Sequence, residues 1–237
     1  MHFDGVELLW RIMCNPHAST LFRKDTTMLP EIPLHPECFS DALLLDISDD
    51  LTEYGWSQQN FFLPEDLTIA LAAECHLLSE TGTLKQAGTG RGAAQTLRLE
   101  IRSDQIAWLK AGQSIACDRY LQIMENLRIA LNRNLYLGLD EYESHFAFYA
   151  PGASYLKHLD RFRDDDCRTV SAVIYLNPDW LLEQGGALRL HPDGKCSEDI
   201  TPSGSRLVLF LSADMLHEVL PATRDRLSLA GWFRRRV

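Results

Sequence analysis

The sequence lacks the features that define several large classes of protein. No uncharged apolar run in its 237 residues approaches the roughly 18 residues of a membrane-spanning helix, so we expect none. Basic residues are fewer than acidic ones: the chain has 23 Lys and Arg and 33 Asp and Glu, so its formal net charge is 23 − 33 = −10. That balance is not the electrostatic footprint of a nucleic-acid-binding protein. We therefore expect an acidic, cytoplasmic protein that binds neither nucleic acid nor membranes.

Paired cysteines are missing as well. The six cysteines are scattered along the chain, and no CxxC motif occurs. In a chain of this length, that pattern predicts buried or free thiols in a reducing compartment rather than a disulfide framework or a zinc site. No internal repeat or low-complexity tract is present, and 46% hydrophobic residues supply the core of a globular domain.

The chain divides into two parts by composition. Residues 1–45 contain four prolines and one short apolar run, which predicts an N-terminal extension with one helix and an irregular segment. Residues 46–237 have the pattern of one compact domain. Pro64 can open a helix that Gly82 ends, and a second helix is expected over 113–132. The apolar stripes of these two helices predict core packing and consist of Leu67, Leu71, Cys75 and Leu78 and of Tyr120, Met124, Leu127 and Leu131.

After Gly138 the apolar period changes from 3.6 to 2, which is typical of strands. Turns rich in Gly, Pro and Asp separate the expected strands, which are Ser144–Ala150, Tyr155–Asp160, Thr169–Asn177, Ala187–His191, Arg206–Leu211 and Arg226–Phe233. Strands this short and this closely spaced predict an antiparallel sandwich or barrel. The fold class is therefore α+β, with helices packed on the outside of the strands.

One short motif in this region suits metal binding. On a strand, His158 and Asp160 face the same side, while Leu159 points away. One imidazole and one carboxylate are two members of the facial triad that binds non-haem Fe(II), and His217 is the candidate for the third. Such a triad leaves three coordination positions open for a bidentate co-substrate and dioxygen.

A candidate anion site follows on the last strand. Alternation places Arg226, Ser228, Ala230 and Trp232 on one face, and a guanidinium beside a hydroxyl suits the capture of a carboxylate in a pocket. A metal together with an anion-binding arginine implies a co-substrate that chelates at one end and is held at the other, as 2-oxoglutarate is. The alternative is that Arg226 pairs on the surface with Asp225 or Asp214.

With these residues in place, the sequence resembles the 2-oxoglutarate- and Fe(II)-dependent prolyl 4-hydroxylase superfamily. It is most similar to the branch of the hypoxia-inducible-factor prolyl hydroxylases and their bacterial relatives. The resemblance runs from Tyr54 to Phe233. It rests on the order and spacing of Ile101 to Trp108, His158-Leu159-Asp160, Ile174 to Asn177 with Asp179-Trp180, Gly185 to Arg189, His217-Glu218-Val219, Arg226 and Trp232.

The resemblance implies a double-stranded β-helix (jelly-roll) core over about residues 140–237, with the N-terminal helices packed against it. It implies Fe(II) bound by His158, Asp160 and His217. It implies 2-oxoglutarate held by its distal carboxylate at Arg226 and Tyr175. The other pocket residues that it implies are Tyr149, Val173, Leu188 and Trp232. At the mouth, where family members meet the peptide substrate, it places Arg168, Asp104 and Trp108.

The function that the resemblance implies is hydroxylation of a prolyl residue in a protein or peptide. Dioxygen is consumed, 2-oxoglutarate becomes succinate and CO2, and ascorbate (vitamin C) serves as a reductant. The same chemistry on another residue or on a small molecule is one alternative, and a binding module without catalysis is a second. The acidic turn after Asp160 is one residue longer than in the family. This difference bears on substrate preference and not on the iron site. The oligomeric state and the role of residues 1–45 do not follow from the sequence.

Overall fold

The computed structural model describes residues 39–88, 98–161 and 167–236. The helix expected near the N-terminus and the acidic residues 164–166 of the turn after Asp160 lie outside these ranges. Among the described helices, none is both long and apolar enough to cross a bilayer. No disulfide joins any two of the four cysteines that the structure describes.

In the described part of the chain, three α-helices precede most of the strands: α1 (Asp41–Glu53), α2 (Glu65–Glu80) and α3 (Ile115–Leu135). Ser40 and Ser114 cap α1 and α3, because each hydroxyl accepts a hydrogen bond from a backbone N–H in the first turn. Pro64 precedes α2, as expected from its fixed φ. The predicted stripes of α2 and α3 face the core, with Leu78 partly buried and the others buried.

The first helix was not among the sequence predictions. It begins at Asp41, before the boundary expected at residue 46, and it buries Leu44, Ile47 and Leu51 in the main core. Those three side chains share one helix face, so the sequence does contain a helical apolar pattern. That pattern extends across the boundary proposed between residues 45 and 46. The division of the chain into an extension and a domain stays a prediction.

The strands form two antiparallel sheets. The larger sheet has the order β1-β9-β6-β11-β4-β3-β2 and the smaller β5-β10-β7-β8. The strands of the larger sheet are β1 (Trp56–Gln59), β2 (Lys85–Gln86), β3 (Gln105–Trp108), β4 (Leu139–Tyr149), β6 (Arg168–Tyr175), β9 (Leu207–Leu211) and β11 (Arg226–Arg235). Those of the smaller sheet are β5 (Tyr155–His158), β7 (Leu188–His191), β8 (Glu198–Ile200) and β10 (Leu216–Val219).

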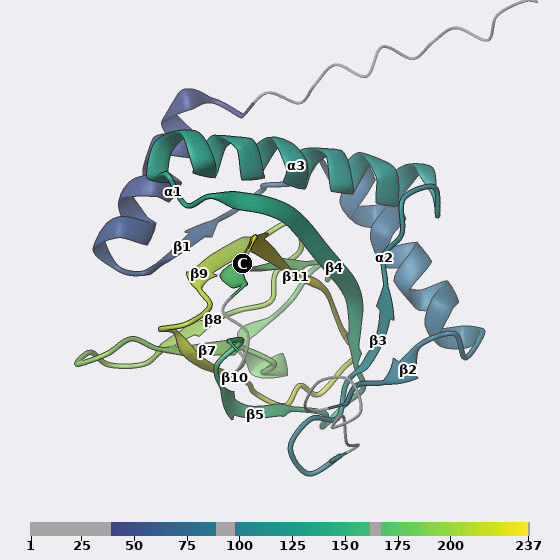
Figure 1. Cartoon of the computed structure of the whole chain (residues 1–237). Helices are drawn as coiled ribbons and strands as arrows, with labels where there is room; N and C mark the ends of the chain where they lie inside the picture. The colour runs from purple at the N-terminus through teal and green to yellow at the C-terminus, as the bar shows by residue number, and fades with distance from the viewer. Residues whose placement is uncertain (1–38, 89–97, 162–166, 237) are drawn as a thin grey trace, which may run out of the picture. The chain divides into compact units, whose positions relative to one another are not determined.

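The two faces of the larger sheet differ in what they contact. Leu227, Leu229 and Phe233 of β11 pack in the core with the helices, which lie on the outer side of this sheet (Figure 1). The alternate residues of β11 line a cavity on the other side, together with residues of the smaller sheet. The alternation predicted for this strand is therefore confirmed. With the helices packed outside, the α+β jelly-roll architecture is confirmed as well.

Two strand predictions near the candidate metal residues need correction. The strand expected over Tyr155–Asp160 ends at His158, and Asp160 lies in the bend that follows. The ladder of β5 stops there because its partner β10 begins at Leu216, one residue before the His217 that pairs with His158. No strand was predicted around His217, although β10 holds it between β5 and β7.

Candidate functional site

Three side chains with metal-binding atoms meet at one end of the cavity. Antiparallel pairing of β5 with β10 sets His158 directly opposite His217. The bend after β5 brings Asp160 to both, with its Oδ1 3.6 Å from His158 Nε2 and 3.8 Å from His217 Nε2. The three candidate ligand atoms lie within 4.8 Å of one another. The structure thus brings together the three residues that the sequence predicts as ligands.

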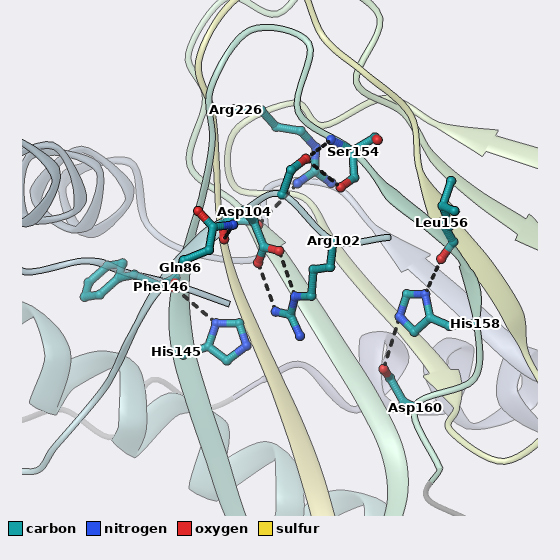
Figure 2. A network of polar contacts seen from close by, with 12 residues as sticks. Gln86, Arg102, Asp104, His145, Phe146, Ser154, Leu156, His158, Asp160 and Arg226 are labelled. Carbon is teal, nitrogen blue, oxygen red and sulfur yellow. Dashed lines mark hydrogen bonds and ion pairs between the residues drawn. The ribbon is translucent and has the colours of Figure 1, made fainter. Parts of the chain in front are cut away.

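Backbone carbonyls orient both imidazoles. His158 Nδ1 lies 2.8 Å from the carbonyl oxygen of Leu156 (Figure 2), and His217 Nδ1 lies 3.0 Å from that of Met215. Each Nδ1–H can donate to its carbonyl, which leaves Nε2 with a lone pair facing the other ligands. Burial lowers the pKa of His217 to about 4, although Asp160 raises it, so this imidazole is neutral at pH 7.

The carboxylate completes a donor set that suits Fe(II). Burial by itself raises the pKa of Asp160, but the two histidines and the Ser171 hydroxyl outweigh burial and lower it below its usual range. Asp160 is therefore ionised. Two imidazoles and one carboxylate on one side of a cavity form the 2-His-1-carboxylate arrangement of non-haem iron sites.

The cavity itself has a volume of about 180 Å³ and lies between the two sheets. The three candidate ligands line it, and so does Arg226 from β11. The lining includes these further residues predicted from the sequence: Trp108, Tyr149, Arg168, Val173, Leu188, Ser228 and Trp232. One cavity thus contains the candidate metal ligands and the candidate anion site.

Arg226 is buried to 1% exposure and has no carboxylate within ion-pair distance among the described residues. Its Nε donates to the carbonyl of Gly186 at 2.8 Å, and its Nη1 lies 3.4 Å from Ser228 Oγ. Gly186 has a φ of +72°, and a Cβ there would lie 2.9 Å from that of Ala222, so glycine is required. The surface pairing with Asp225 or Asp214 considered from the sequence is excluded.

Among the described residues, three side-chain donors are buried without a hydrogen-bond partner: Trp232 Nε1 and two that lie near each other. The Tyr175 hydroxyl and Arg226 Nη2 are buried without a hydrogen bond, and the guanidinium carbon lies 5.1 Å from the Tyr175 ring centroid. Leaving such groups unsatisfied costs about 1–3 kcal/mol each, and more for a charged one. A ligand carboxylate would satisfy both donors and neutralise the buried charge. The residues present therefore fit 2-oxoglutarate held at its distal carboxylate, as they fit Fe(II) at the opposite end.

Of the three residues predicted at the mouth of the cavity, Arg168 and Trp108 line it and Asp104 does not. Arg168 lies over the Trp232 ring, with its guanidinium carbon 3.5 Å from the ring centroid, and donates from Nε and Nη2 to one oxygen of Glu143. Trp108 lines the cavity and is 46% exposed, so a large substrate can reach it. Asp104 is fully buried and does not line the cavity, because both of its oxygens accept hydrogen bonds from Arg102 (Figure 2).

Sequence reasoning missed Arg102, Tyr155 and His145, all of which line the cavity. The Tyr155 ring stacks on the imidazole of His158, with 3.6 Å between the two ring centroids. The guanidinium carbon of Arg102 lies over the Tyr155 ring, 4.7 Å from its centroid. Arg102 could have been inferred from its position two residues before Asp104, since a buried acid needs a partner. Nothing in the sequence predicts that the Tyr155 ring stacks on His158.

The buried imidazole of His145 is expected to make the free energy of unfolding depend on pH. It is buried between Trp108 and Trp232, and burial, aided by Arg102, lowers its pKa to about 4. As pH falls below 6.5 the unfolded chain gains this proton and the folded protein does not, so stability falls with pH in that window. Between pH 7 and pH 5 this single group is expected to remove about 2 kcal/mol.

Urea unfolding of chelator-treated protein at the two pH values measures this effect. The variant His145→Phe is expected to lose about 2 kcal/mol less than the wild type over that interval. Because His217 remains in both proteins, its contribution cancels in the difference. His76→Phe, which alters an exposed histidine on α2, serves as the control. An equal loss in the wild type and the His145 variant would contradict the prediction.

Comparison with known proteins agrees with this geometry. Residues 144–234 match the family described as the 2OG-Fe(II) oxygenase superfamily, the class to which a jelly roll with a His-Asp-His site belongs. A crystal structure of a Pseudomonas putida prolyl-4-hydroxylase is 52% identical with a TM-score of 0.75, covering 82% of this chain and 100% of that one. A Trichoplax adhaerens prolyl hydroxylase, solved with a hypoxia-inducible-factor peptide fragment, is 27% identical with a TM-score of 0.73, covering 81% of this chain and 89% of that one.

Among curated proteins, mouse Egl nine homolog 1 is 28% identical over 193 residues, which cover 77% of this chain and 47% of the relative. The chain thus spans about half the length of that relative. The chain belongs to the 2-oxoglutarate- and Fe(II)-dependent prolyl 4-hydroxylase superfamily. The described residues fit Fe(II) and 2-oxoglutarate, the two groups after which the matched family is named.

Proposed function

We propose that the protein hydroxylates a prolyl residue of a protein or peptide, giving 4-hydroxyproline, with conversion of 2-oxoglutarate to succinate and CO2. One observation carries the proposal. A single cavity has the His158, Asp160 and His217 triad at one end and the buried Arg226 at the other, and no carboxylate of the described residues pairs with Arg226. That arrangement suits an anionic co-substrate that chelates a metal while its far carboxylate is bound by the protein.

Bound Fe(II) supplies the activation of dioxygen, which couples oxidation of 2-oxoglutarate to insertion of one oxygen atom into a C–H bond of the substrate. The chain's residues prepare this step by binding and orientation. His158 and His217 present Nε2 because their Nδ1 atoms are held by carbonyls. Arg226 and Tyr175 bind the distal carboxylate and so set the distance between co-substrate and metal.

The walls between the two ends exclude water. Leu188 and Val173 line the cavity, and Tyr149 lies with its ring centroid 5.0 Å from the guanidinium carbon of Arg226. A dry site limits side reactions of an oxidising intermediate. Ascorbate, in this proposal, is the reductant that restores Fe(II) after turnover without substrate.

A polypeptide substrate is favoured by the mouth. Trp108, which is 46% exposed, offers an apolar ring at the mouth, and Arg168 and Arg102 border the same cavity. Aromatic faces suit a proline ring, and guanidinium groups suit backbone carbonyls and acidic side chains. We propose Trp108 and Arg168 as substrate contacts, with Asp104 acting through Arg102.

The test is succinate formation by anaerobically reconstituted protein given Fe(II), 2-oxoglutarate, air, ascorbate and a panel of proline-containing proteins. We expect substrate-stimulated succinate and a mass increase of one oxygen atom on proline; chelator-treated protein is the control. Succinate without modified proline would send the search to other residues or small molecules. No succinate from iron-loaded protein under any condition would favour a binding module and contradict the proposal.

A further inference from the structure

Two serines form a hydrogen-bonded chain behind the candidate metal ligand Asp160. Ser171 of β6 has its Oγ 2.7 Å from Asp160 Oδ2, and its Oγ lies 2.9 Å from the Oγ of Ser212, which follows β9. Both serines are buried, with 1% and 0% exposure. Ser171 lies on β6 and Ser212 directly follows β9, which pairs with β6, so the larger sheet holds this hydrogen-bonded chain in place.

The direction of the hydrogens follows from the chemistry of the groups. An ionised carboxylate only accepts, so Ser171 must donate its one hydroxyl hydrogen to Asp160 Oδ2. Ser171 Oγ can then only accept from Ser212, which must be the donor in that pair. The chain therefore runs from Ser212 through Ser171 to Asp160, and each bond polarises the next.

The two oxygens of Asp160 thus have different surroundings. Oδ1 faces the Nε2 atoms of both histidines, whereas Oδ2 is held by Ser171 on the other side. A carboxylate held in this way offers the metal one oxygen. One-oxygen binding matters because a facial triad must leave three positions open, two for a chelating co-substrate and one for dioxygen.

We propose that Ser171 and Ser212 are positioning residues that hold Asp160 as a one-oxygen metal ligand. This inference rests on the proposed metal site. Outer hydrogen-bond partners of metal ligands typically contribute 10–100-fold to metal affinity. We expect Ser171→Ala to weaken binding of Mn(II), used as an air-stable probe, by about that factor. Ser212→Ala, which removes only the outer bond, is expected to weaken binding in the same direction by less.

Two further variants separate positioning from general damage. Ser171→Thr keeps the hydroxyl and suits a strand, so it should restore affinity to near the wild-type value. Ser57→Ala is the matched control, because Ser57 is equally buried and donates to Asp50 Oδ2 at the same 2.7 Å, on β1. It should leave Mn(II) affinity unchanged.

Mn(II) binding is measured on the full chain by the electron paramagnetic resonance signal of the free ion. The absorption band of the anaerobic Fe(II)–2-oxoglutarate complex is recorded in parallel and should shift in Ser171→Ala but not in Ser57→Ala. Wild-type affinity and an unshifted band in Ser171→Ala would overturn the inference while leaving the metal site intact. Wild-type protein that binds Mn(II) no better than His217→Ala would overturn the metal site itself.

Discussion

Replacing His217 by alanine is expected to reduce 2-oxoglutarate turnover to the level of chelator-treated protein. Only His158 and Asp160 would remain to hold the metal, and the missing imidazole is one that burial keeps neutral and a carbonyl orients. Alanine at either of the other two ligands should have the same effect. Succinate formation and the iron content of the desalted protein measure the two consequences separately.

The matched control is His76→Ala, which removes an exposed imidazole from α2. It should retain both turnover and iron. If His217→Ala kept iron-dependent turnover at the wild-type rate, the triad would not be the metal site. Far-ultraviolet circular dichroism of each variant shows whether the jelly roll has folded.

The second large effect is expected at Arg226. Lysine at this position keeps the positive charge but loses the planar fork that can donate to both oxygens of a carboxylate. We expect Arg226→Lys to weaken 2-oxoglutarate binding by roughly 10–100-fold, or about 1.4–2.8 kcal/mol, while metal binding is unchanged. Titration of 2-oxoglutarate into anaerobic metal-loaded protein measures the affinity directly.

Arg189→Lys provides the comparison for this variant. Arg189 also uses its fork, donating from Nε and Nη2 to the two oxygens of Asp199, but it lies on the surface of β7. Its replacement should not alter 2-oxoglutarate affinity. Unchanged affinity in Arg226→Lys would refute the assigned role, and lost metal binding would show that the two ends of the cavity are not independent.

Much of the fold was predictable because it depends on local periodicity. The stripes of α2 and α3 and the alternation on β11 each arise from the geometry of one element, so neighbouring residues suffice to predict which side chains share a face. The helix α1 shows the limit. Its apolar period is equally regular, but proline-rich sequence before it suggested an irregular segment, and only packing against the other helices includes it in the core.

The short strands of the smaller sheet were harder to predict. The strand β10 spans only Leu216–Val219, which is too short for its alternation to stand out, and it exists because β5 and β7 pair with it on either side. The same is true of the end of β5, where Asp160 leaves the ladder. These boundaries depend on pairing with strands that are distant in the chain, and a local sequence pattern does not reveal such partners.

By itself, the sequence determined the kinds of groups at the site, which are His158, Asp160, His217 and Arg226. It also determined that Arg226 and Ser228 share a strand face. Only the tertiary structure decided that His217 lies opposite His158 and that Arg226 is buried with no carboxylate of the described residues in reach. It also decided that Arg102 rather than Asp104 lines the cavity, and that Ser171 and Ser212 form a hydrogen-bonded chain to Asp160. The physical reason is that side-chain direction follows from the local backbone period. Strand pairing and burial, in contrast, depend on contacts between segments far apart in the chain.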